Sequence, residues 1–404
     1  MEKSLAYEKQ INNPEENINV ENWHYAVDAY EKHEYRTALR NLFSYIDDRI
    51  VLPEAEEFEI KIPHGSIVLQ MKVEDGKFCL KAPFVKIPED ATGLAILRQT
   101  TELNFTYLIL SQIVKVGDEL YFQYEDKIEN CEPYKMYSLF EEICYGADYY
   151  DDIFISKYKA SFIQKPELDY FSQEQKDLAF QKFQEILTEA LSFGEYLENK
   201  RYYASMCDLY ATCLAKLDYI FAPQGILGSD LNDILNSMYE EEDAQAISNK
   251  AKGKLKKLLE YDRKKFDNSL FYPKFFVPQK RRAELPLVQD FFKNSYENSA
   301  NSIANSAFLS ASLVLYYAIY DLFYRYRVPW EIEVILEKAL QSSSTKDWNV
   351  CAHNLYAAIE KIMKMEKLHK KEPNSRSTAR KKTALKGSTS VVNTVVNKIM
   401  SFFK

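Results

Sequence analysis

The spacing of apolar residues switches from helical to strand and back within the first 160 residues, and this constrains the fold most. Near the N-terminus apolar residues recur every three or four positions, as in Ala38, Leu42 and Ile46, which is helical spacing. Between Phe58 and Glu125 they mostly alternate with polar residues, as on strands with one buried face. The chain is therefore expected to begin with an α+β module, at residues 21–165.

The first helical stretch has a break near Lys32-His33-Glu34. This predicts either two short antiparallel helices or one kinked helix, ending before Pro53.

Two β-hairpins are predicted in the alternating region. The first turns at Asp75-Gly76, between one alternating run that starts at Ile67 and another that ends at Phe84. A helix-like stretch at 91–104 separates it from the second, which is expected to start at Phe105, pass through Ile109 and turn at Gly117-Asp118.

A long helix is predicted after Pro133. Asp151 and Asp152 are expected to lie on its solvated edge, because adjacent acids on a helix point in different directions.

From residue 166 to 367 only helical spacing is found, which predicts an all-helical domain. Ser172 is its first capping residue, a basic helix spans 251–266, and a long helix runs from about 288 to 327. Two antiparallel helices follow at 331–341 and 348–367. The remaining segments are predicted as a flexible lead (1–20), a basic disordered linker (368–390) and an amphipathic C-terminal helix (391–404).

The composition argues against a catalytic or cofactor-binding centre. Average usage would give about 28 glycines in such a chain, and this one has 10, whereas phosphate-binding loops need glycine. Neither a Gly-flanked nucleophile nor a phosphate-loop motif occurs, and the five histidines are scattered. The sequence predicts no enzyme, no cofactor and no metal site.

Cysteine usage and the N-terminus predict a cytoplasmic protein. The six cysteines lie far apart and form no Cys-x-x-Cys pair, as expected of free thiols in a reducing compartment. The polar N-terminus has no apolar leader, and the longest uncharged run has an apolar part too short to span a bilayer.

Residues 250–282 are the first segment that suggests a partner, because they hold twelve Lys/Arg against three acids in a chain of net charge −8. Three interpretations are open: docking on an acidic protein surface, binding of single-stranded nucleic acid by stacking and phosphate contacts, or aromatic rings packed on the core with solvated basic groups. Nucleic acid ranks below protein. The candidate partner-binding residues are Lys256, Lys257, Arg263, Lys264, Phe275, Phe276, Arg281 and Arg282.

The C-terminus is the second such segment. Residues 367–386 carry eight Lys/Arg and one acid, and an apolar stripe follows that includes Val395, Ile399, Phe402 and Phe403. A basic tether ending in an apolar helix suits a partner's groove, the protein's own body or the surface of an anionic membrane. A partner or self-docking is favoured, because a Val-rich helix forms poorly alone.

The element order of residues 22–160, namely helix, three strands, helix, two strands and helix, resembles the type III secretion chaperone-like fold, also seen in the YbjN family. Tyr35, Ala38 and Leu39 also resemble a tetratricopeptide helix pair, although the turn departs by one residue and no second copy follows.

The resemblance implies a non-enzymatic chaperone or adaptor that binds a protein client and serves a secretion or injection apparatus. Since folds of this kind often form dimers, it also implies a homodimer. It also implies that a sheet face bearing Ile67, Leu69, Phe78, Leu80, Ile109 and Phe122 packs against helices or a partner. The alternative is a helical scaffold held on a larger assembly or a membrane surface by its basic segment and C-terminal helix.

Overall fold

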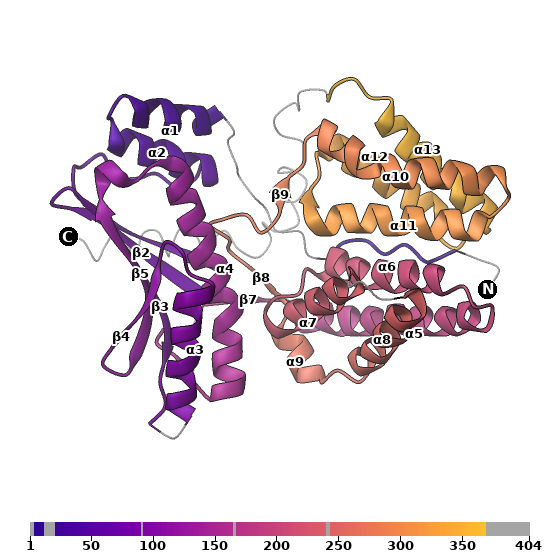
Figure 1. The fold of residues 1–404 in the computed structure, drawn as a ribbon, viewed down its shortest axis with the longest axis horizontal. Helices are drawn as coiled ribbons and strands as arrows, with labels where there is room; N and C mark the ends of the chain where they lie inside the picture. Colours follow the sequence, from indigo (N-terminus) through magenta and orange to yellow (C-terminus); the bar gives the residue numbers. More distant parts are fainter. Residues whose placement is uncertain (1–3, 12–20, 90–91, 165–166, 240–242, 369–404) are drawn as a thin grey trace. The chain divides into compact units, whose positions relative to one another are not determined.

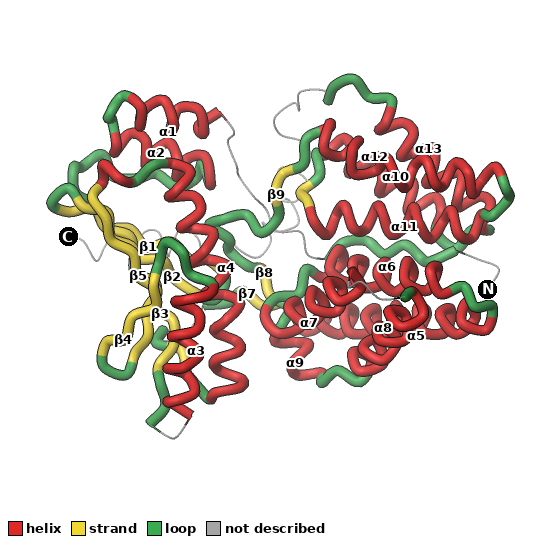
Figure 2. Tube along the Cα trace, viewed as in Figure 1, coloured by secondary structure: helices red, strands yellow, loops and turns green. Residues whose placement is uncertain are grey.

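The computed structural model describes residues 4–11, 21–89, 92–164, 167–239 and 243–368, which form an α+β region followed by helices (Figures 1 and 2). The predicted α+β class is confirmed. Residues 1–363 form one compact unit. The predicted C-terminal helix, with Val395, Ile399, Phe402 and Phe403, lies outside the described residues, as does most of the predicted linker and lead.

Two helices precede the sheet, α1 (Glu21–Glu31) and α2 (Tyr35–Ile46). His33 adopts a left-handed conformation between them, with φ of 61°. Since a helix cannot continue through such a residue, the two-helix alternative is the observed one.

The sheet is antiparallel, in the order β1-β2-β3-β5-β4. Asp75 and Gly76 both have positive φ, as a type I′ turn requires, so the first predicted hairpin is confirmed. A two-residue strand, β6, pairs with the end of β3. The strands are β1 (Phe58–His64), β2 (Ile67–Glu74), β3 (Lys77–Lys86), β4 (Gln112–Val116), β5 (Glu119–Lys127) and β6 (Ser161–Phe162).

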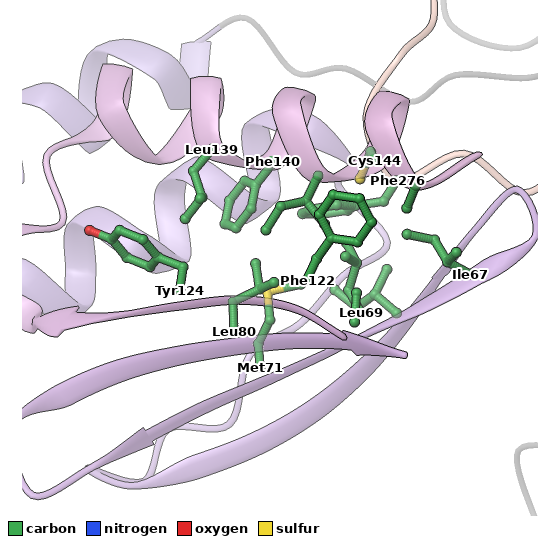
Figure 3. Packing of buried hydrophobic residues seen from close by; sticks show 14 of the residues in the cluster. Ile67, Leu69, Met71, Leu80, Phe122, Tyr124, Leu139, Phe140, Cys144 and Phe276 are labelled. Atoms are coloured by element: carbon green, nitrogen blue, oxygen red, sulfur yellow. The ribbon is translucent and has the colours of Figure 1, made fainter. Parts of the chain in front are cut away.

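The predicted long helix, α4 (Pro133–Tyr158), crosses one face of the sheet (Figure 1). Glu132 caps it by accepting a hydrogen bond of 2.8 Å from the Lys135 N–H. The side chains of α4 and of the strands point toward one another in the core that Figure 3 shows. Buried residues of this core include Leu69, Leu80, Phe122, Leu139 and Phe140.

The second predicted hairpin begins later than expected. Phe105 belongs to α3 (Thr92–Thr106), and β4 starts only at Gln112. Phe105 and Ile109 are 85% and 88% exposed. Of the six residues expected on the packed sheet face, five are buried and Ile109 is the exception.

The rest of the described chain is helical, apart from four two-residue strands that the sequence analysis did not predict. Ser172 forms the predicted cap of the first long helix, as a capping box with Gln175. The helices are α5 (Gln173–Asn199), α6 (Tyr203–Phe221), α7 (Gly225–Asn236), α8 (Ala244–Leu259), α9 (Arg263–Asn268), α10 (Leu285–Ala304), α11 (Phe308–Arg325), α12 (Trp330–Ser343) and α13 (Trp348–Met363), with 3₁₀ turns η1 (Ile128–Asn130) and η2 (Ser237–Tyr239).

The short strands pair distant segments. β7 (Asp169–Tyr170) lies antiparallel to β8 (Phe271–Tyr272), and β9 (Arg281–Arg282) lies parallel to β10 (Tyr326–Arg327).

The predicted single helix over 288–327 is wrong, because the chain divides there into α10 and α11. Ser306 lies between the two helices with φ of 60°. The predicted basic helix is likewise two helices, α8 and α9.

Two glycines within helices give a matched test of packing. A Cβ at Gly194 of α5 would overlap the ring hydroxyl of the fully buried Tyr210, whereas a Cβ at Gly253 of α8 would meet no atom within 4 Å. We expect Gly194→Ala to lower the free energy of unfolding by about 1–3 kcal/mol. Gly253→Ala should raise it by about 0.5–1 kcal/mol through helix propensity. Denaturant unfolding measures the free energy of unfolding of both variants. The same change in this free energy for both would contradict the packing explanation.

Candidate functional site

The basic residues predicted to bind a partner do not form one patch. Lys256 and Lys257 are exposed in the last turn of α8, and Lys264 is exposed in α9. Arg263 instead forms ion pairs with Asp177 and Asp267, and its guanidinium lies 4.8 Å from the centre of the Phe180 ring. Arg263 therefore has a structural role in joining α9 to α5.

The aromatic residues of the same segment are used inside the fold. Phe276 is 2% exposed, and its ring centre lies 5.4 Å from that of Phe43 and 5.2 Å from that of Phe140. The Phe275 ring lies 5.2 Å from the imidazole of His64. Phe276 is unavailable for stacking on a partner, and the observed arrangement is that of aromatic rings packed on the core.

His64 fixes this segment to the sheet. Its Nδ1 accepts hydrogen bonds from the backbone N–H groups of Phe276 (3.1 Å) and Val277 (3.4 Å). Burial lowers the pKa of His64 to about 3, so the ring stays neutral and Nδ1 remains an acceptor at neutral pH.

A surface groove of about 660 Å³ runs along the side of α4 that faces away from the sheet core. Its residues on α4 are spaced four, three and four positions apart, which places them on one face of the helix. One wall is the loop after α3, and the other is the segment before α10. The groove is lined mainly by Tyr134, Ser138, Glu141, Glu142 and Tyr145 of α4, Tyr107, Ile109 and Leu110 of the loop, and Gln279 and Arg281.

The loop that carries Ile109 is held by one carboxylate. Glu142 accepts hydrogen bonds from the backbone N–H groups of Ile109 (2.7 Å), Leu110 (3.2 Å) and Ser111 (2.8 Å). The Ser111 hydroxyl adds a fourth, of 2.6 Å. These bonds use the N–H groups that a longer β4 would have needed, and they leave the Ile109 side chain directed to solvent.

Tyr107 positions the start of the loop against α4. Gly146 leaves room for it, because a Cβ there would lie 2.8 Å from the Tyr107 ring. Burial and the neighbouring Tyr150 raise the pKa of Tyr107 to about 12, so its hydroxyl stays neutral.

The groove contains a few charged groups among its apolar residues. Desolvation raises the pKa of Glu141, and Arg281 partly offsets this shift. Arg282 is exposed on β9, next to Arg281. Lys135, which also lines the groove, forms an ion pair of 2.8 Å with Asp126. The groove thus offers apolar contact area with isolated charges, as protein-binding surfaces do.

The sequence analysis did not identify Phe105, Ile109 and Tyr134 as surface residues. The signal that could have shown Phe105 and Ile109 is the run Phe105-Thr-Tyr-Leu-Ile-Leu110, which holds more apolar side chains than the short strand after it can bury.

The prediction that Asp151 and Asp152 lie on a solvated edge is wrong. Asp151 is 1% exposed, and the Ser66 hydroxyl donates to it and to Asp148. The Ser66 N–H also donates to Asp148, at 3.0 Å. A side chain at Gly225, where φ is 64°, would approach the Asp152 carboxylate to 2.5 Å. The β1–β2 turn and the start of α7 therefore bury these carboxyl groups.

Burial, with repulsion from Asp148, raises the pKa of Asp151 far above its usual range and that of Asp152 to about 6. Tyr170 and Tyr261, which face Asp152, add no positive charge. The described residues contain no group of three or more His, Cys, Asp or Glu side chains suited to hold a metal ion. The cluster is best explained as buried acids, with Asp151 protonated at neutral pH, that join α4 to its neighbours.

No family model, curated protein or solved structure matches the chain. Among the residues that the structure describes, no helix has the length and apolar character needed to cross a bilayer. All six cysteines are free.

Replacing Glu142 tests the loop. In Glu142→Ala the N–H groups of residues 109–111 lose their acceptor, so their amide hydrogen exchange should become roughly tenfold faster or more. Glu141→Ala, one residue away on the same helix, should leave their exchange unchanged. Equal protection in both variants would show that Glu142 does not hold the loop.

Asp151→Asn tests the buried acids. A carboxyl group whose pKa is raised by folding favours the folded state at low pH, and this contribution is lost as the pH rises through the folded-state pKa. The variant should therefore be more stable than wild type by about 1–3 kcal/mol near pH 8, and the gain should shrink toward about pH 5.

Denaturant unfolding at several pH values measures this gain. The control is Asp126→Asn, which removes a carboxylate whose pKa is lowered by Lys135 and should destabilise the protein at neutral pH. Loss of stability in Asp151→Asn at pH 8 would contradict the assignment.

Proposed function

We propose that this protein is a non-enzymatic adaptor or chaperone that binds a segment of a protein partner in the groove along α4. The observation that carries the proposal is the 88% exposure of Ile109, which lines that groove, together with the 85% exposure of Phe105, four residues earlier in the chain. Large apolar side chains grouped on a surface typically mark a protein-binding site.

The rigidity of the loop supports the proposal. Since Glu142 already fixes the backbone at Ile109, binding would order few additional groups, and less of the interaction energy would be lost to conformational entropy. Tyr134, 59% exposed, adds an aromatic ring with a polar tip, a side chain favoured at protein interfaces.

The element order α1-α2-β1-β2-β3-α3-β4-β5-α4 is the one on which the resemblance to chaperone-like folds depends. Service to a secretion or injection apparatus, and a cytoplasmic location, are part of the proposal on that resemblance alone. Nucleic acid is less well supported, because Phe276, which would stack on bases, is packed in the core.

Affinity purification of the tagged full-length protein from its own cells, with quantification of the co-purified proteins, tests the proposal. A charge at Ile109 should abolish recovery of a near-stoichiometric partner, so we expect Ile109→Asp to lose it. Val51→Asp is the matched control, because Val51 is an aliphatic residue of similar exposure, 86%, and lies outside the groove lining.

Equal partner recovery with both variants would place the binding site elsewhere. Absence of any stoichiometric protein with the wild-type chain would contradict an adaptor function.

A further inference from the structure

The two edges of the sheet differ in how their backbone groups are used. In the β4–β5 hairpin Val116 faces Glu119 across a two-residue turn, so the N–H and C=O of Ile113 point away from β5. The side-chain amide of Asn104 accepts from the Ile113 N–H (2.7 Å) and donates to its C=O (3.0 Å). A side chain of α3 thus occupies the β4 edge, which blocks addition of another strand there.

At the other edge, β1, the part of the chain that the structure describes provides no such cover. His64 faces Ile67 across the β1–β2 turn, so the backbone N–H and C=O groups of His64, and of every second residue before it, form hydrogen bonds with β2. The backbone groups of the residues between them point away from β2, toward the open edge. The outward backbone groups belong to Glu59, Lys61 and Pro63. Within the described residues, no other element hydrogen-bonds to the backbone of these three.

We propose that a second copy of this chain adds to β1 as an antiparallel strand, with the twofold axis at Ile60. The two sheets then join edge to edge, and Glu59 of each copy lies directly opposite the partner's Lys61. The strand is complementary in charge to itself, as a symmetric interface requires.

The register follows from the hydrogen-bond pattern and the charges. In an antiparallel pair, a residue whose backbone groups point to the new edge must lie opposite a residue of the same kind in the partner. These residues are two positions apart in β1, so the twofold axis passes through a residue and not between two. An axis at Glu59 or Lys61 would place like charges opposite each other. An axis at Ile62 would place Lys61 opposite Pro63, which has no N–H to donate.

The side chains also match on both faces of the joined sheet. On the core face Phe58 would lie opposite the partner's Ile62, and Ile60 opposite the partner's Ile60; all three pack against the core of the module. On the outer face Glu59 already lies opposite Lys72 of β2, so positive and negative side chains alternate across the junction. This surface is separate from the groove, so the inference does not rest on the proposed function.

Sedimentation equilibrium of the full-length protein, from about 1 to about 100 µM, tests the proposal. We expect wild type to dimerise in a concentration-dependent manner. Glu59→Lys and Lys61→Glu should each weaken the dimer about tenfold or more, because each places two like-charged pairs across the axis. An equimolar mixture of the two variants should form a heterodimer at least as strong as the wild-type dimer, since Lys then faces Glu in both pairs across the axis.

Lys115→Glu is the control, because it makes the same charge change on the covered edge and should leave dimerisation unchanged. Thermal unfolding confirms that each variant is folded. A wild-type chain that stays monomeric over the whole range would overturn the proposal. So would a dimer that neither substitution weakens, or single variants whose mixture does not recover association.

Discussion

The insertion of Phe276 and Val277 into the core above the sheet is the interaction on which the arrangement of residues 1–363 depends. Two backbone N–H groups enter that core with the two side chains, and buried N–H groups need acceptors. The neutral imidazole of His64 accepts from both. Tyr145 also donates a hydrogen bond of 2.5 Å to the C=O of Pro278. The segment between α9 and α10 therefore contributes two side chains to the core of the α+β module, which does not bury its apolar surface fully without them.

The two sides of α4 divide structural from surface roles. One side packs Leu139, Phe140 and Ile143 on the sheet, and its C-terminal half carries the buried acids that lie against the β1–β2 turn and the start of α7. The other side forms the floor of the groove. Because the core side is fixed by so many contacts, the groove side is held rigid, which suits a binding surface.

Sequence periodicity predicted the elements that depend on contacts between neighbouring residues. It failed where residues far apart in the sequence determine where an element begins or whether a side chain is buried. The Asp75-Gly76 hairpin and the Ser172 cap depend on adjacent residues and were predicted correctly. The late start of β4 depends on Glu142, 31–33 residues further on, and burial of Asp151 depends on Ser66, 85 residues earlier. The break at Ser306 is carried by neither Gly nor Pro, and the Asn and Ser residues before it are a weaker turn signal that the apolar spacing overrode in the prediction.

The candidate partner-binding residues illustrate the same limit. Basic and aromatic residues interleave at 250–282, but Phe276 is buried in the core and Arg263 forms ion pairs. Composition alone therefore overestimated how many of these residues are available to bind a partner. Exposed apolar area lies instead at Phe105 and Ile109, in a run that resembled a buried strand. A protein gains nothing in its own stability from holding Ile109 in water with three backbone hydrogen bonds to one carboxylate. That arrangement is best explained if the apolar surface is buried against another chain, and the cost of ordering the loop is then met during folding and not during binding.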